Sequence, residues 1–106
     1  MILWQSLKKS DFKNFKNKIK NDYFSIHFAK DAQRTTPGIG FRLSKKHLKN
    51  AVARNVCKRS LREFCRLNSL PFNKIILSTL QKIPLNNKNL KKELKQLLCR
   101  LNQEYF

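Results

Sequence analysis

The chain is poor in acidic residues, histidine and cysteine. It has six Asp and Glu, two His and three Cys among its 106 residues. These few residues form no pair of carboxylates that could serve acid–base catalysis and no Cys/His cluster that could hold a hydrolytic metal ion. Cys57, Cys65 and Cys99 are odd in number and lack metal-ligand spacing. We therefore expect reduced core thiols and no metal bound by the protein.

Long apolar runs are also missing. None approaches the roughly 20 residues that span a bilayer, so we expect no membrane partner. The first residues, MILWQSLKKSDF, place their charges after a short apolar stretch, which is not the layout of a secretory signal. A cytoplasmic protein is the expectation. Because no repeat, linker or low-complexity segment interrupts the chain, residues 1–106 are expected to form one domain.

Positive charge, by contrast, is abundant. The 24 Lys and Arg give a formal net charge of +18, well beyond the magnitude of about 2–8 that keeps a small domain soluble. A polyanionic partner relieves self-repulsion of this size, and neutralised phosphates release their counterions. Since 41% of the residues are hydrophobic and eight are Phe, the chain can form a core. A folded nucleic-acid-binding protein is expected.

The hydrophobic pattern of the first half predicts one helix and two strands. Ser10 can cap a helix whose apolar face carries Phe12, Phe15 and Ile19 at i, i+3 and i+7. Alternating residues predict strands at 23–28 and at 39–43, separated by a turn that ends at Pro37. The second of these strands has Ile39, Phe41 and Leu43 on one face.

The second half is expected to fold as helix, strand and helix. Residues 50–67 have helical periodicity, and residues 74–80, KIILSTL, are predicted to form a buried strand. Pro84 interrupts the chain before a last helix. The residues predicted to face the core from that helix are Leu90, Leu94, Leu97, Leu98 and Leu101. Each helix has one apolar face to bury, so the class is α+β, a sheet with helices packed on it.

The helix predicted at 50–67 has two contrasting faces. Its apolar stripe is Ala53, Val56, Cys57, Leu61, Phe64 and Cys65, and its opposite arc is Asn55, Lys58, Arg59, Arg62 and Arg66. A helix face that is merely solvated usually mixes charge signs, yet Glu63 is the one acid among residues 40–66. Arg binds phosphate bidentately, and Asn reaches base edges or a 2′-hydroxyl. The pattern favours RNA binding over simple solvation.

At these residues the sequence resembles the bacterial ribonuclease P protein family. The family signature is S-K-K, a short gap, A-V, then R-N-x-x-K-R and R-E-x-[FC]-R. In this chain it reads Ser44-Lys45-Lys46, Ala51-Val52, Arg54-Asn55, Lys58-Arg59 and Arg62-Glu63-Phe64-Cys65-Arg66. The LKKSDF start and the leucine-rich last helix agree with it as well. The resemblance covers almost the whole chain, with its specific motifs in the central third.

The resemblance implies both a fold and an activity. The fold would have the order α-β-β-β-α-β-α, about four mixed strands, and a left-handed β-α-β crossover, and it is related to the second domain of a small-subunit ribosomal protein. The activity would be that of a subunit of ribonuclease P, an endoribonuclease whose RNA removes the 5′ leader from precursor tRNA. The chemistry would use Mg²⁺ held by the RNA. No catalytic residue or cofactor is therefore implied for the protein.

The resemblance implies two binding surfaces. The implied partners are the catalytic RNA and precursor tRNA, and no DNA partner is expected. The residues that would contact the catalytic RNA are Lys45, Lys46, Arg54, Asn55, Lys58, Arg59, Arg62 and Arg66. A cleft between the first helix and the sheet would hold the tRNA leader, through Phe12, Phe15, His27 and Arg42. The residue types alone leave alternatives, because Phe12 and Phe15 fit core packing equally well and His27 fits a half-exposed surface position.

Three other functions fit the sequence less well. A ribosomal or other structured-RNA-binding protein explains the charge and size but not the spaced signature. A DNA-binding repressor would need a partner helix across a short turn before residues 50–67, and the preceding GFRLSK segment is a predicted strand. A nuclease acting alone lacks acidic or His clusters.

Overall fold

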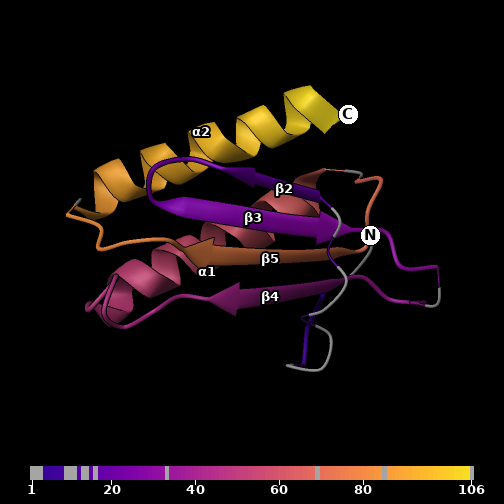
Figure 1. Cartoon of the computed structure of the whole chain (residues 1–106), viewed down its shortest axis with the longest axis horizontal. Coiled ribbons are helices and arrows are strands. Elements are labelled where there is room, and N and C mark those ends of the chain that lie inside the picture. The colour runs from indigo at the N-terminus through magenta and orange to yellow at the C-terminus, as the bar shows by residue number, and fades with distance from the viewer. Residues whose placement is uncertain are drawn as a thin grey trace.

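The computed structural model describes residues 4–8, 12, 15, 17–32, 34–68, 70–84 and 86–105. Its described part is a five-stranded mixed sheet with two helices on one face, so the α+β class is confirmed (Figure 1). The sheet has one strand more than expected. The elements are β1 (Gln5–Ser6), β2 (Asn17–Lys20), β3 (Phe24–Ala29), β4 (Gly38–Arg42), α1 (Ala51–Leu67), β5 (Lys74–Thr79) and α2 (Asn87–Tyr105).

The strand order across the sheet is β1-β4-β5-β3-β2. The pairs β1–β4 and β4–β5 are parallel, whereas β5–β3 and β3–β2 are antiparallel. Helix α1 connects the parallel neighbours β4 and β5. In Figure 1 both of these strands point to the left, α1 lies behind the sheet and β5 lies above β4. The crossover is therefore left-handed, against the right-handed form found in about 98% of such connections.

The prediction of a helix near the N-terminus, with Phe12, Phe15 and Ile19 on its apolar face, is wrong over the described residues. Asn17–Lys20 is strand β2, which pairs with β3 in the register Ile19↔Ile26, and neither Phe12 nor Phe15 is helical. Ser10, the expected cap, lies outside the described residues. A tight turn joins β2 to β3, because the Asn21 side-chain oxygen accepts hydrogen bonds from the backbone N–H groups of Tyr23 (2.9 Å) and Phe24 (2.8 Å). Pairing with β3 thus overrides the weak helical spacing.

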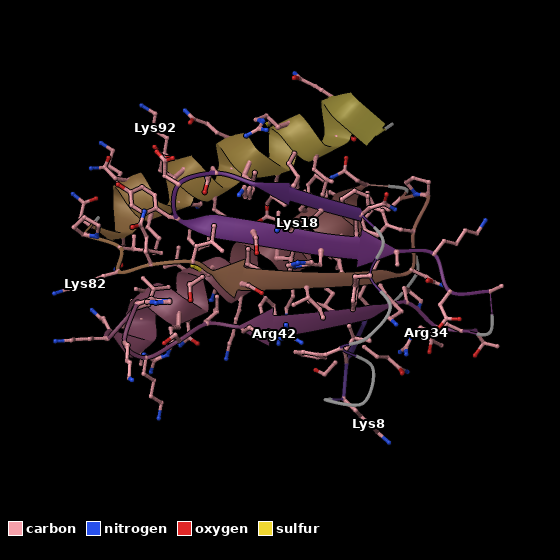
Figure 2. The ribbon with its side chains drawn as sticks, viewed as in Figure 1. Lys8, Lys18, Arg34, Arg42, Lys82 and Lys92 are labelled. Atoms are coloured by element: carbon pink, nitrogen blue, oxygen red, sulfur yellow. The ribbon has the colours of Figure 1, made fainter. Side chains whose placement is uncertain are left out.

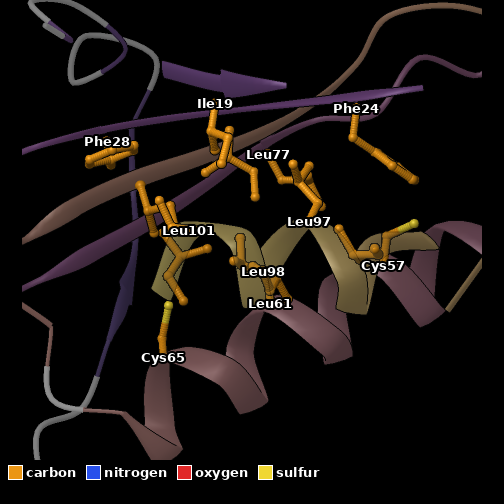
Figure 3. Packing of buried hydrophobic residues seen from close by; sticks show 14 of the residues in the cluster. Ile19, Phe24, Phe28, Cys57, Leu61, Cys65, Leu77, Leu97, Leu98 and Leu101 are labelled. Atoms are coloured by element: carbon orange, nitrogen blue, oxygen red, sulfur yellow. The ribbon is translucent and has the colours of Figure 1, made fainter. Parts of the chain in front are cut away.

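The other elements confirm their predicted positions. Asn50 caps α1 by accepting a hydrogen bond from the Val52 N–H at 2.8 Å, and Asn86 does the same for the Asn89 N–H of α2, also at 2.8 Å. All five leucines predicted to face the core from the last helix are buried. They pack with the buried face of α1 and with one face of the sheet in a single cluster (Figure 3).

The cysteines follow their expectation only in part. Cys57 and Cys65 are buried free thiols in the core, but Cys99 is exposed on α2. Burial raises the pKa of Cys57 to about 11 and that of Cys65 to about 12, so both remain protonated at neutral pH. Neither described helix is long and apolar enough to cross a membrane.

Candidate nucleic-acid interface

One surface is the outward side of α1, called here the α1 ridge and defined by Asn55, Lys58, Arg59, Arg62 and Arg66. All are exposed except Lys58, which is half-buried. Their spacing follows from the helix, since the opposite stripe is fixed in the core through Ala53, Cys57, Leu61 and Cys65. Buried apolar contacts therefore hold the cationic side toward solvent. The structure brings together all five predicted residues of this helix face.

Phe41 on β4 supports two cations of the α1 ridge. The Lys58 Nζ lies 6.0 Å and the Arg62 guanidinium carbon 5.5 Å from the centroid of its ring. Such cation–π contacts contribute about 0.5–1 kcal/mol each at exposed sites. They also restrict the two long side chains before any ligand arrives. The sequence pattern indicated Phe41 only as a core residue.

Lys45 and Lys46 project from a turn built around Ser44. The Ser44 carbonyl accepts hydrogen bonds from the backbone N–H groups of His47 (3.1 Å) and Leu48 (2.9 Å). The Ser44 N–H donates to the Thr79 hydroxyl at 3.1 Å, which ties the turn to the end of β5. Both lysines are exposed, and they lie just before the N-terminus of α1.

Arg54 has a different environment from the rest of the predicted RNA-binding set. Its Nη1 donates to the backbone carbonyl oxygens of Leu48 at 2.6 Å and Lys49 at 3.1 Å, and the residue is half-buried. The guanidinium thus ties the segment before α1 to the first turn of that helix. Part of its donor capacity is used inside the protein, a role that the sequence did not indicate.

Replacing Arg54 with alanine is expected to lower the free energy of unfolding by about 1–3 kcal/mol, because two carbonyl groups lose a charged donor. Arg59→Ala is the matched control, because Arg59 is exposed; it should change stability by about 0.5 kcal/mol or less. Urea denaturation followed by circular dichroism measures both variants. Equal stability of the two variants would contradict the structural role of Arg54.

The second surface is the face of the sheet away from the two helices, called here the open face. Strand alternation and register place the following residues on it: Gly38, Gly40 and Arg42 of β4, Lys74, Ile76 and Ser78 of β5, Ser25, His27 and Ala29 of β3, and Lys18 and Lys20 of β2. Figure 2 looks onto this face, with Lys18 on β2 and Arg42 on β4, and strands β3 and β5 lie between them. These strand residues include four cations, one histidine and no acid.

Phe12 packs against β4 on the open face. The Arg42 guanidinium carbon lies 4.9 Å from the centroid of the Phe12 ring, and Arg42 Nη2 donates to the Phe12 carbonyl at 3.3 Å. Gly40 makes this approach possible, since a Cβ at that position would lie 2.7 Å from Phe12 Cζ. Phe12 itself is half-buried, so part of its side chain remains accessible to a ligand.

Phe15 packs against side chains of β3 and β5 on the open face. Its ring meets the His27 imidazole edge-on, with centroids 6.3 Å apart, and the Lys74 Nζ lies 4.8 Å from its centroid. The four residues predicted for leader contact, Phe12, Phe15, His27 and Arg42, therefore gather on one face. Lys74 packs against the Phe15 ring beside them but is itself buried, as expected for a residue that the sequence pattern indicated only as the start of a buried strand.

The pKa of His27 lies below its ordinary value. Burial is the main cause, and the positive charges of Lys18 and Arg42 add to it. These effects favour the neutral form of His27 in the free protein. A phosphate bound on the open face would offset these positive charges and raise the pKa.

Acidification is expected to destabilise the protein through His27. Because the folded-state pKa is depressed, its contribution to stability is complete above the unfolded value of 6.5 and is lost as the pH falls below it. Thermal unfolding measured from pH 7.5 down to about 5 should show a larger loss of stability for the wild type than for His27→Gln. Parallel curves would contradict the depressed pKa.

Comparison with known proteins identifies the family. The sequence model of the family described as Ribonuclease P matches residues 6–102. The chain belongs to the ribonuclease P protein family. The matched range includes both candidate surfaces, since every site residue predicted from the sequence falls between positions 12 and 66.

Solved structures of ribonuclease P proteins share the fold. The Staphylococcus aureus protein is 23% identical, with 92% of this chain and 94% of that chain covered and a TM-score of 0.70. The Thermotoga maritima protein is 25% identical, with 79% and 82% covered and a TM-score of 0.53. No curated protein matches the chain in sequence. The family signature at residues 44–66 thus sits on the ribonuclease P protein fold.

Proposed function

We propose that this chain is the protein subunit of a bacterial ribonuclease P, acting in the cytoplasm. It binds the catalytic RNA and the 5′ leader of precursor tRNA and promotes endonucleolytic removal of that leader. Membership of the ribonuclease P family over residues 6–102 carries this proposal. The two cationic surfaces on different sides of the sheet support it, because an enzyme subunit of this kind needs one surface for each RNA.

In this proposal the α1 ridge, Arg54 and the exposed Lys45 and Lys46 contact the catalytic RNA. Phosphate contacts by these side chains position the protein without reading RNA sequence. Each neutralised phosphate releases counterions, so binding depends steeply on salt. The same charges screen the repulsion between the catalytic RNA and precursor tRNA and lower the requirement for divalent metal ions.

The open face binds the leader in this proposal. Single-stranded bases stack on aromatic rings, and the cations around them hold the backbone. Mature tRNA has lost the leader, so this contact favours substrate over product. The described residues hold no group of three His, Cys, Asp or Glu side chains that could ligate a metal ion. We assign the Mg²⁺ used in the reaction, and the chemical step itself, to the RNA.

Reconstitution tests the proposal. The full chain is added to a bacterial ribonuclease P RNA at a magnesium concentration too low for the RNA alone, and cleavage of a precursor tRNA is followed on a gel. We expect accurate leader removal to be restored. A control reaction with mature tRNA of the same sequence should show weaker binding than the precursor.

An absence of stimulation, with equal affinity for unrelated structured RNAs, would overturn the proposal and favour a generic RNA-binding protein. Cleavage by the protein without any catalytic RNA would overturn the assignment of chemistry to the RNA. The two outcomes are told apart by their reactions: the first is measured with the catalytic RNA present, and the second with the protein alone.

A further inference from the structure

A hollow lies at one end of the molecule, and none of its lining residues belongs to the α1 ridge or to the open face. Its volume is about 420 Å³, and it is lined by the turn before α1, the first turn of α1 and the segment leading into α2. The C-terminal ends of β4 and β5 and the N-termini of α1 and α2 all lie at this end, on the left in Figure 1. This hollow is called here the end pocket.

Three lysines from two distant parts of the chain line the end pocket. Lys46 and Lys49 come from the turn before α1, and Lys82 comes from the segment after β5; Figure 2 shows Lys82 at the same end. All three are exposed. No acidic residue lines this pocket, whose other members are His47, Leu48, Asn50, Ala53, Ile83, Asn86 and Asn87. Lysines gathered in one hollow without a counter-charge repel each other, and an anion would relieve that repulsion.

The backbone around the end pocket is held in place before any ligand binds. The Ile83 N–H donates to the His47 carbonyl at 3.0 Å, which joins the two sides of the pocket. His47 Nδ1 is 2.9 Å from the Thr79 hydroxyl. Arg54 draws the carbonyl oxygens of Leu48 and Lys49 into its own hydrogen bonds. The positive charge of Arg54 therefore offsets the partial negative charge of these two carbonyl oxygens, which would otherwise repel an anion.

Two helix N-termini add a favourable field at the same place. The first turns of α1 and α2 contain no acidic residue, and their caps, Asn50 and Asn86, both line the pocket. The leading N–H groups of a helix lack intrahelical acceptors and favour negative charge. These dipoles act together with the lysines rather than in place of them.

Two further hollows in the described part of the chain have a different character. One, of about 330 Å³ between α1 and α2, contains Lys91 and Lys95 but also Glu63, so its charge is partly compensated. The other, of about 480 Å³, has Arg66 as its one charged lining residue among apolar and neutral side chains. A cluster of uncompensated cations is thus a property of the end pocket among these three.

We propose that the end pocket binds phosphate groups of an RNA strand, as an anion site separate from the α1 ridge and the open face. This RNA is the catalytic RNA, which we propose to lie along α1. The pocket opens at the N-terminus of that helix and shares Lys46 with the surface proposed for the catalytic RNA. The inference rests on the proposed function for the identity of that RNA. The anion site itself does not depend on it.

The test uses the variant K49Q/K82Q and a matched control, K91Q/K95Q. Each removes two lysines, and the control lysines are exposed on α2 outside the end pocket. Pyrophosphate is titrated into each full-length protein, and backbone amide shifts are recorded by NMR. Amides of residues 51–53 and 87–89 should shift together in the wild type. Affinity for pyrophosphate should fall about tenfold in K49Q/K82Q and less than about twofold in the control.

The RNA arm measures binding to the catalytic RNA across a salt series. The slope of log K against log salt should flatten by about one to two units in K49Q/K82Q and by less in K91Q/K95Q. Equal pyrophosphate affinity in the two variants would overturn the anion site. Selective weakening of pyrophosphate binding with equal salt slopes would overturn the RNA assignment and indicate a site for a free polyphosphate. If the wild type binds no catalytic RNA at all, the proposed function fails, while the pyrophosphate result still decides the anion site.

Discussion

Replacing both Arg59 and Arg62 with alanine is expected to weaken binding to the catalytic RNA about 100-fold or more, because each substitution removes a charge-assisted hydrogen bond of about 1.5–3 kcal/mol. Both side chains are exposed on the α1 ridge, and Arg62 is held over Phe41. The slope of log K against log salt should flatten by about two units, one for each phosphate that is no longer neutralised. Filter binding over a series of salt concentrations measures both quantities.

The matched control removes the same charge from the other helix. Lys91 and Lys95 are exposed on α2, so Lys91→Ala with Lys95→Ala lowers the net charge equally but leaves the α1 ridge intact. We expect its affinity for the catalytic RNA to stay within about threefold of the wild type, since charges beyond a Debye length are screened. Similar weakening in both double variants would mean that net charge, and not the ridge, determines binding. Thermal unfolding of the variants should remain close to that of the wild type.

The sequence predicted the long elements well because their periodicity is repeated many times. In α2 five leucines recur at helical spacing and all are buried. In α1 the apolar stripe and the basic arc lie on opposite sides, and Asn50 provides a favourable cap. A pattern of this length outweighs local exceptions. Strands β3 and β4 were found from shorter signals, since apolar side chains alternate along each of them. Strand β5 was found from its central apolar residues, Ile75, Ile76 and Leu77.

The N-terminal region was mispredicted because its signal was short. Phe12, Phe15 and Ile19 fit a helix by spacing, but Ile19 flanked by Lys18 and Lys20 fits an edge strand equally well. The exposed lysines and the buried Ile19 of β2 show which alternative holds. The Asn21-Asp22 pair before the next strand was an available hairpin signal. Strand β1, at two residues, is too short to leave any pattern.

The candidate site was predictable where it followed the family signature, but its internal contacts were not. The roles of Arg54 and Lys74 depend on which residues the fold brings near them. Arg54 contacts carbonyls that lie before its own helix, and Lys74 reaches the ring of Phe15, which is far away in sequence. The Arg54 contacts depend on the path of the chain just before α1. The Lys74 contact depends on how residue 15 packs against the sheet. The helical and strand periodicity of the sequence specifies neither.

Strand β4 links the two proposed RNA-binding surfaces. Adjacent residues of a strand point to opposite faces of the sheet, and Phe41 and Arg42 do so here. Phe41 lies beneath Lys58 and Arg62 of the α1 ridge, whereas Arg42 lies over Phe12 on the open face. One strand therefore sets the positions of cations on both sides. A shift of β4 would alter both proposed RNA-binding surfaces at once.

Replacing Phe12 and Phe15 together with alanine is expected to weaken binding of precursor tRNA to the reconstituted enzyme about 10- to 100-fold, because base–aromatic stacking contributes about 1–3 kcal/mol per base. Binding of mature tRNA should change by less than about twofold, since it has no leader to stack. Both residues are half-buried on the open face beside Arg42 and Lys74. Equilibrium dissociation constants for the two tRNAs, measured with the same enzyme preparation, give the discrimination ratio.

The competing interpretation is that the two rings serve only as core, and a second substitution separates the possibilities. Gly40→Ala places a Cβ 2.7 Å from Phe12 Cζ, so the ring must move while its chemistry is retained. We expect this variant to lose part of the discrimination between precursor and mature tRNA but to assemble normally with the catalytic RNA, because the α1 ridge is untouched. If the Phe12 and Phe15 variant instead loses stability and binds both tRNAs equally less well, the rings act as core. Reduced discrimination in both variants, with assembly preserved, is the result that leader contact on the open face requires.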